Sequence, residues 1–265
     1  MAERVYAKLV AARLRGQMSY RLSFVLDCLA QALAQVSELA VILVLFHRVR
    51  ALGGFSVEEV LLLYALTSLA FGLADAVAGQ LERLPTYLLS GSFDALLLRP
   101  LGTLPQLAVS DIQLRKLGRV VAGLALLGYA LARNDIAWSP WTAVLAAVAP
   151  LAGAVLFGSV WVVGGAACFW LVNGQELTNS FTYGGSAFAS YPITVYGDWT
   201  RRLMAFVVPL AFVSYYPGLA LLGRPDPLGG PAWLGWISPL VALAAACAAG
   251  LVWRWAVRHY RGTGS

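Results

Sequence analysis

Long uncharged stretches of apolar residues alternate with short polar or basic segments along most of the chain. A helix needs about 20 predominantly apolar residues to cross the hydrocarbon core of a bilayer. This pattern predicts membrane-spanning helices at about residues 24–46, 57–79, 107–132, 141–172 and 236–255. The third stretch begins with the charged residues Asp111, Arg115, Lys116 and Arg119, so we expect this end to protrude into the headgroups or the cytoplasm.

Hydropathy leaves the remaining span open. Residues 177–199 are only moderately apolar, whereas residues 203–222 are strongly apolar but are interrupted by Pro209 and Pro217. Using 203–222 as the span would move Arg201 and Arg202 to the inner side, which charge alone slightly favours. A seven-span arrangement is excluded because it would place the basic C-terminus outside.

Two segments are too polar to cross a membrane. Residues 1–22 carry cations throughout, and no apolar region follows the first of them promptly, so they predict a basic amphipathic helix lying on the membrane surface rather than a signal peptide. The segment from 81 to 105, between the second and third spans, is interrupted by glycine and proline. It predicts a loop with one or two short helices.

Composition supports a membrane protein made of one domain, residues 1–265. Hydrophobic residues make up 60% of the chain and charged residues 12%, with a mean hydropathy of +0.72, whereas soluble domains carry about 25% charged residues. With six spans and both termini inside, 13 of the 19 lysines and arginines lie on the cytoplasmic side. The cations therefore indicate orientation, and no nucleic-acid partner is expected.

Polar residues form a stripe on each of the first two predicted spans. Asp27, Gln31, Gln35 and Glu38 share one helical face of the first span, and Ser68, Gly72, Asp75 and Gly79 share one face of the second. Carboxylates at membrane depth are costly, so both stripes must face other helices, another subunit or a wet cavity. The pattern leaves open whether they pack helices or line a substrate path.

The chain lacks the motifs of an enzyme. Its two lysines, Lys8 and Lys116, are each followed by leucine, so the sequence contains no GxxxxGK[ST] phosphate-binding loop. The cysteines lie in apolar runs and the histidines stand alone, so no disulfide framework or metal site is predicted. Any use of ATP must come from a partner.

A short amphipathic helix is predicted between the second and third spans. The sequence GSFDALLLRPL, from Gly91 to Leu101, places leucines and Phe93 beside Asp94 and Arg99, and Pro100 ends the helix. So much apolar surface on a loop must be covered, either by lipid or by a protein partner.

The chain resembles the six-span permease subunits of ABC-2 type exporters. The resemblance rests on the basic N-terminus, on GSFDALLLRPLGTLPQ, and on YPITVYGDWTRRLMAFVVPLAFVSYYPGLALLG. It implies that the short helix is a coupling helix that docks on a separate ATP-binding subunit, where ATP and magnesium are held. The residues that it assigns to this contact are Phe93, Asp94, Leu97, Arg99 and Pro100.

The same resemblance implies the topology and the path. The fold class is an all-α integral membrane protein with spans including 177–199, and with residues 200–222 as a re-entrant extracellular element before the last span. Two permease subunits would form the path between their second and fifth spans. The expected path or interface residues are Asp27, Gln31, Gln35, Glu38, Thr67, Ser68, Phe71, Asp75, Thr182, Tyr183 and Phe188.

The expected function is that of a transmembrane subunit of an ABC exporter in the bacterial cytoplasmic membrane. Hydroxyl and aromatic side chains on the expected path suit an amphipathic substrate better than a bare ion. The expected partners are an ATP-binding subunit, a second permease subunit and the lipid bilayer. A stand-alone channel or secondary transporter, and a membrane scaffold, remain the alternatives.

Overall fold

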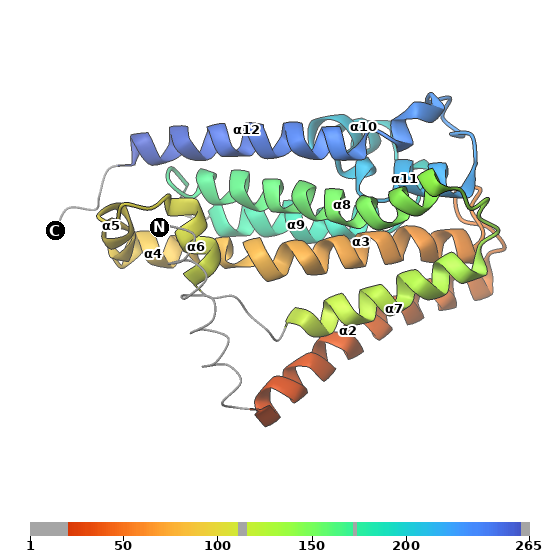
Figure 1. Cartoon of the computed structure of the whole chain (residues 1–265), viewed down its shortest axis with the longest axis horizontal. Helices are drawn as coiled ribbons and strands as arrows, with labels where there is room; N and C mark the ends of the chain where they lie inside the picture. The colour runs from red at the N-terminus through yellow and green to blue at the C-terminus, as the bar shows by residue number, and fades with distance from the viewer. Residues whose placement is uncertain (1–20, 111–115, 172–173, 261–265) are drawn as a thin grey trace.

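A computed structural model describes residues 21–110, 116–171 and 174–260, and within these ranges the chain is helical without strands (Figure 1). The longer helices are α2 (Arg21–Arg48), α3 (Val57–Ala78), α7 (Leu117–Arg133), α8 (Pro140–Ala167), α9 (Gly174–Ala189) and α12 (Ser238–His259). The shorter elements are η1 (Gly79–Arg83), α4 (Leu84–Leu89), α5 (Ser92–Leu97), α6 (Thr103–Ser110), η3 (Ile193–Val195), α10 (Asp198–Arg202), η4 (Leu203–Val207), η5 (Leu210–Phe212), α11 (Tyr215–Leu222) and η6 (Ala232–Gly235).

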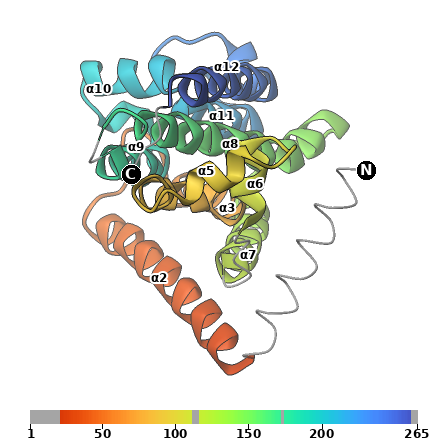
Figure 2. The ribbon, with the colours of Figure 1, turned by 90° about the vertical axis from the view of Figure 1, so that its left-hand side faces the viewer.

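Helix α3 lies at the centre of the bundle. It packs against α2, α7, α8, α9 and α11, as the end-on view in Figure 2 shows for most of these helices. In the α3 region, 78% of the most apolar stretch is buried inside the protein, against 11% for α2. A capping box starts the helix: the Ser56 hydroxyl accepts from the Glu59 amide, and the Glu59 carboxylate accepts from the Ser56 amide.

Small residues allow the central helices to approach closely. A Cβ atom at Gly153 of α8 would lie 2.8 Å from the Cβ of Ala70 in α3, and one at Gly164 would lie 2.5 Å from the Thr178 side chain in α9. Such spacing is typical of helix contacts in membranes, where association depends on close van der Waals packing. Helix α12 packs along the outer side of α8, so α3, α8, α9 and α12 form one body.

Helices α2 and α7 diverge from this body (Figure 1). Helix α7 crosses α3 at Gly123, where an added Cβ would lie 3.0 Å from the Cα of Leu69. Helix α2 in turn crosses α7 at Gly118, whose added Cβ would lie 2.6 Å from the Cys28 carbonyl oxygen. Most apolar side chains of α2 are exposed, as expected for a helix that faces lipid or another subunit.

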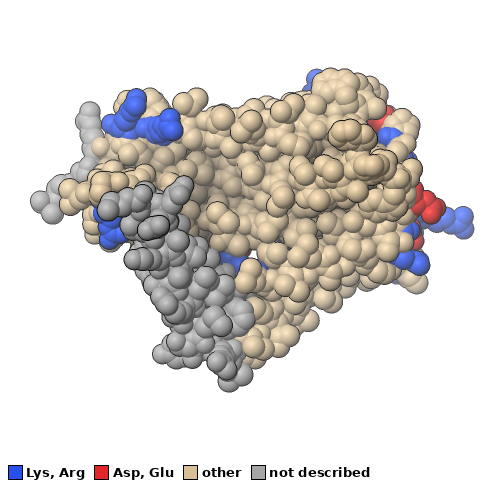
Figure 3. All heavy atoms as spheres, in the orientation of Figure 1, with Lys and Arg blue, Asp and Glu red and all other residues tan. Residues whose placement is uncertain are grey.

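The bundle has two polar ends, which we call the α5 end and the α11 end. The α5 end carries α4, α5, α6 and the last turn of α12, and the α11 end carries α10, α11 and the loops beside them (Figure 1). On the face drawn in Figure 3, charged side chains gather at these ends, and the long band between them is almost free of charge. This distribution is typical of a membrane-spanning bundle.

Two expected spans differ in their bounds. Helix α9 ends at Ala189 rather than near residue 199, because Pro192 disfavours helical geometry at the residue before it and cannot donate a backbone hydrogen bond. Residues 107–110 belong to α6, so the helix of the third predicted span begins at Leu117 within the described part. The segments Asp198–Val207 and Leu210–Leu222 meet at a bend of 72°.

Several expectations fall outside the described residues. These are the amphipathic surface helix at 1–22, the charged residues Asp111 and Arg115, and Arg261 of the basic tail. They stay predictions from the sequence.

We predict that Gly123→Leu destabilises the protein by about 1–3 kcal/mol, because the larger side chain would overpack the contact between α7 and α3. Thermal unfolding of the detergent-solubilised protein measures the effect. Gly128→Leu is the matched control, since Gly128 lies in the same helix and an added Cβ meets nothing within 4 Å. Equal melting temperatures for the two variants would contradict the packing described here.

Candidate functional site

The polar stripes predicted on the first two spans meet each other. The Gln35 amide of α2 donates a hydrogen bond to the Ser68 hydroxyl of α3, and both side chains are buried. The Tyr64 hydroxyl, also on α3, lies 3.1 Å from the Gln35 carbonyl oxygen and 3.1 Å from a carboxylate oxygen of Glu38. The stripes therefore form a direct polar contact between α2 and α3.

Helix α7 supplies two cations to the same region. The Lys116 ammonium lies 2.6 Å from the Asp75 carboxylate, and both side chains are largely buried, with 14% and 12% exposed. The Arg119 guanidinium lies 3.6 Å from the Glu38 carboxylate and stacks over the Phe71 ring, 4.6 Å from its centre. We call these residues the interior polar cluster: Gln35, Glu38, Tyr64, Ser68, Phe71, Asp75, Lys116 and Arg119.

The expectation that Lys116 and Arg119 protrude into the headgroups or cytoplasm is wrong. Both side chains turn into the bundle because the carboxylates of α2 and α3 need cationic partners at membrane depth. Glycines make the space: a Cβ at Gly79 would lie 2.5 Å from the Lys116 nitrogen, and one at Gly72 would lie 3.4 Å from the Arg119 side chain. The spacing of the two cations, on one face of a helix, is the sequence signal that points to this arrangement.

Helix α9 adds aromatic and polar side chains beside the cluster. The Tyr183 ring lies 5.4 Å from the Phe71 ring, and the Trp161 indole of α8 donates a hydrogen bond of 3.1 Å to the Glu82 carboxylate. Tyr183 is 47% exposed, and the Glu38 side chain is 53% exposed. In Figure 2, α9 and part of α2 lie on the same side of the bundle. This side presents polar and aromatic groups outward.

Besides Gln35, Ser68 and Phe71, the structure buries three more of the predicted path residues: Thr67, Thr182 and Phe188. Thr67 donates a hydrogen bond of 2.8 Å to the Ala189 carbonyl, and Thr182 donates to the Thr178 carbonyl within α9. Phe188 packs its ring 4.6 Å from the Tyr196 ring. These residues fix α9 against the bundle and expose no surface to a path. Asp27 and Gln31 lie half-buried nearer the start of α2.

The short helix predicted between the second and third spans is present as α5. It begins after Gly91, whose positive φ of 67° favours glycine, and it is followed by Pro100. The Gln106 amide of α6 shapes the segment by donating hydrogen bonds to the carbonyl oxygens of Leu96 and Leu101, at 3.1 and 2.9 Å. The short helix is therefore held in a defined position.

The two faces of α5 differ sharply. Asp94, Leu97, Arg99 and Pro100 are exposed, and so is Leu98, which is 87% exposed. Phe93 faces the opposite way: it is fully buried, with the Phe169 and Tyr260 rings 5.3 and 5.1 Å away. The sequence analysis assigned Phe93 to the contact with the ATP-binding subunit, together with the exposed residues. In the structure, its side chain packs against the bundle instead.

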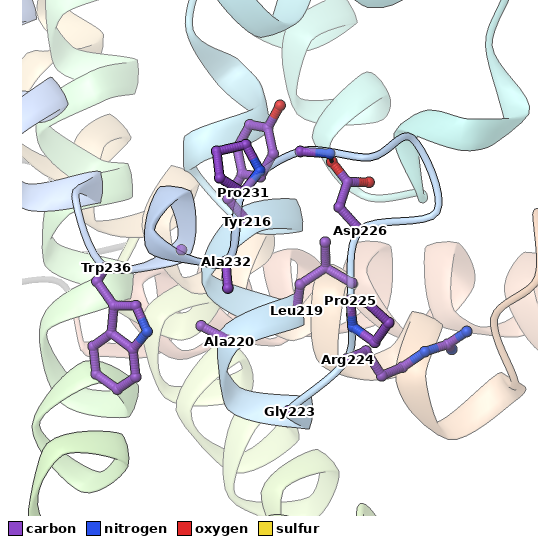
Figure 4. A pocket seen from close by; sticks show the side chains of 12 residues that line it. Tyr216, Leu219, Ala220, Gly223, Arg224, Pro225, Asp226, Pro231, Ala232 and Trp236 are labelled. Carbon is purple, nitrogen blue, oxygen red and sulfur yellow. Dashed lines mark hydrogen bonds between the residues drawn. The ribbon is translucent and has the colours of Figure 1, made fainter.

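A pocket of about 380 Å³ lies at the α11 end, with Trp236 on one side and Arg224 on the other (Figure 4). Its charged side chains have partners within the chain. Arg224 lies 2.6 Å from the Glu59 carboxylate, and Asp226 accepts a hydrogen bond of 2.7 Å from the Tyr215 hydroxyl. These contacts brace the loop after α11. Within the described residues no group of three or more Cys, His, Asp or Glu side chains could hold a metal ion.

Comparison with known proteins decides the family. A family model described as ABC-2 family transporter protein matches residues 32–264. The chain belongs to this family. No curated protein and no solved structure matches the chain.

Membership confirms the resemblance to ABC-2 permeases of about 260 residues. The ABC-2 protein is a multi-pass membrane protein and the permease component of an ABC transporter. Permeases of this family are typically the non-catalytic membrane component and generally work as dimers with an ATPase partner. Among the described helices, four are long and apolar enough to cross a membrane, or five if the bent pair is one span.

We predict that Asp75→Ala destabilises the ABC-2 protein by roughly 3 kcal/mol, the lower end for breaking a buried ion pair, because it leaves Lys116 without a partner. The double variant Asp75→Ala/Lys116→Ala should recover part of this loss. The free energy of unfolding of the single and the double variant, determined in mixed detergent micelles, measures both effects.

The control for this pair is Asp198→Ala, which removes an exposed partner of Arg201 and should change stability by less than about 1 kcal/mol. A double variant as unstable as the sum of its two single variants would show that Lys116 and Asp75 are not coupled.

Proposed function

We propose that the chain is the transmembrane subunit of an ABC exporter, which forms a path for an amphipathic substrate while a separate subunit hydrolyses ATP. The observation that carries this proposal is the exposed surface of α5. A short helix outside the long apolar helices presents Leu97, Leu98 and Arg99 to its surroundings. Leucines at such exposure, beside a cation and Asp94, fit a protein partner better than water.

The proposed topology has six spans, formed by α2, α3, α7, α8, α9 and α12. Helices α7 and α9 have 17 and 16 residues, which corresponds to lengths of about 25 Å at 1.5 Å per residue. Such helices reach across a bilayer core of about 30 Å if it thins locally or flanking residues extend the span. The bent pair between α9 and α12 would then be the re-entrant element.

The charge distribution supports the orientation. We place the α5 end in the cytoplasm of a bacterial cell, with both termini on that side. The described cations at that end include Arg83, Arg99, Arg254 and Arg258, whereas Arg48, Arg50, Arg133, Arg201, Arg202 and Arg224 lie at the α11 end. The support for this orientation is the count over the whole sequence, in which six spans with both termini inside place 13 of the 19 lysines and arginines on the inner side, as the positive-inside rule favours. The acids Glu58, Glu59, Asp135, Asp198 and Asp226 all lie at the α11 end.

The proposed path lies along the side of the bundle that exposes Glu38 and Tyr183. A carboxylate more than half exposed on a spanning helix cannot face lipid at low cost, so a second permease subunit or water must cover it. The outward groups combine a charge with aromatic rings, which suits a substrate with polar and apolar parts. The path would form where two such sides meet.

The test of this function is reconstitution with the ATP-binding subunit. The chain should co-purify with the P-loop protein encoded beside its own gene. ATP should then drive uptake of substrate into inside-out membrane vesicles, or into proteoliposomes from the chains whose cytoplasmic face points outward. A P-loop lysine variant of the partner should abolish export without dissociating the complex. Export or leak without any ATPase subunit would instead indicate a channel or secondary transporter, and a stable complex without ATP-driven export would indicate a scaffold.

We predict that Arg99→Glu weakens the complex with the ATPase subunit and lowers ATPase activity by about tenfold, the usual effect of losing roughly 1.4 kcal/mol at an interface. Membrane insertion should persist, since the Arg99 side chain is exposed. Co-purification and phosphate release measure the effect.

Arg133→Glu is the matched control, because Arg133 is exposed at the opposite end of the bundle. A complex of normal affinity and activity in the Arg99 variant would contradict docking on α5.

A further inference from the structure

The inner face of α5 is held by aromatic side chains from two other helices. Phe93 is fully buried, and its neighbours Phe169 and Tyr260 lie directly after the C-terminal ends of α8 and α12. The Phe169 ring also lies 5.5 Å from Tyr260 and 5.7 Å from Trp253. We call Phe93, Phe169, Trp253 and Tyr260 the aromatic clamp.

A second contact ties the same segment to α12. The Trp253 indole donates a hydrogen bond of 3.1 Å to the Thr103 hydroxyl, at the start of α6. The segment that contains α5 is therefore attached at its beginning through Phe93 and just beyond its end through Thr103. Both attachments lead to α12, which is distant in sequence.

The covalent connections of α5 are weaker mechanical links. Toward α3, the chain passes through η1 and α4 and then through a turn at Ser90 and Gly91. A push on α5 would be absorbed partly by such turns, whereas closely packed rings transmit displacement because protein interiors are nearly incompressible. The aromatic clamp is the direct packed route from α5 into α8 and α12.

We propose that the aromatic clamp is a positioning device that passes motion of the docked ATPase subunit from α5 into α8 and α12. The proposal rests on the proposed function, since it assumes that the ATPase subunit docks on α5. Helices α8 and α12 then move together, because they pack along each other. Helix α7 packs on α3 and is paired with α2 and α3 through the interior polar cluster, so the proposal predicts that α8 and α12 change their separation from α7 during the cycle.

The Tyr260 phenol contributes its ring to the clamp. Its hydroxyl is buried, and within the described part of the chain no partner meets hydrogen-bond distance and angle limits, although the Asp94 carboxylate lies nearby. Burial and the nearby Asp94 carboxylate raise the pKa of Tyr260, so the phenol remains neutral at physiological pH. Removing the hydroxyl should therefore leave the clamp intact, which provides a conservative control.

The experiment follows the distance between α12 and α7 in the complete complex with its ATPase subunit, in nanodiscs. One spin label is placed on Cys247, an exposed native cysteine of α12, and one on Leu124→Cys of α7, with Cys28 and Cys168 replaced by serine. Labelled chains are diluted among unlabelled chains so that only distances within one chain are recorded. Pulsed EPR compares the complex without nucleotide and with ATP and vanadate.

The test variant is Phe93→Leu/Tyr260→Leu, which keeps apolar volume but removes two rings. We expect the fraction of chains that change distance to fall by about fivefold, the lower end for coupling between distant sites, while the ATPase subunit stays bound. Tyr260→Phe should behave as the wild type, and so should Tyr129→Leu, which removes an exposed ring on α7.

The outcomes separate the two proposals. If the wild-type chain holds no ATPase subunit, or shows no nucleotide-dependent change, the proposed function fails. If the wild type responds and the test variant responds equally, or loses only its ATPase subunit, the clamp proposal is overturned. Should the test variant not fold, Trp253→Phe decides, because it keeps a ring beside Phe169 but removes the bond to Thr103: a smaller response supports the clamp and an unchanged response overturns it.

Discussion

The need to pair charges on membrane-spanning helices determines how α2 and α7 are arranged against α3. Asp75 of α3 and Glu38 of α2 lie on predicted spanning helices, and both are matched by cations of α7, Lys116 and Arg119. Removing a charge from water is costly, and the cost is offset only when a partner of opposite sign is close. The pairs therefore determine which way α7 turns and tie α2 and α7 to α3, beside the apolar packing of α7 on α3. Glycines at 79, 118 and 123 leave the space that these contacts require.

The arrangement of α3, α8, α9 and α12 depends on close packing. Helices α3, α8, α9 and α12 meet through small residues and buried rings, and most of the central helix is removed from lipid. The aromatic clamp extends this packed body to α5 at one end of the bundle. An ABC-2 permease must respond as a unit to a partner that contacts a small surface. Close packing and buried ion pairs together join the long helices of the bundle.

The sequence predicted much of the fold because hydropathy depends only on local composition. The all-helical class and the positions of α2, α3, α8 and α12 followed from the lengths of the apolar runs, and the family followed from motifs around α5 and α11. The bounds of α9 were wrong, because the turn before Pro192 outweighed a moderately apolar composition. Helical periodicity placed Gln35 on a polar face without knowledge of its partner, and the structure gives it a contact with Ser68 of α3.

By itself, the sequence determined which segments are apolar enough to span a membrane, where the cations lie between them, and that it contains no GxxxxGK[ST] motif. Only the tertiary structure decided the partners: Lys116 and Arg119 turn inward, Thr67 and Thr182 are buried, and Phe93 points into the bundle rather than toward a docking subunit. The reason is physical. Hydropathy and periodicity are properties of one helix, whereas burial and charge pairing depend on which helices cross, and on the glycines that let them approach.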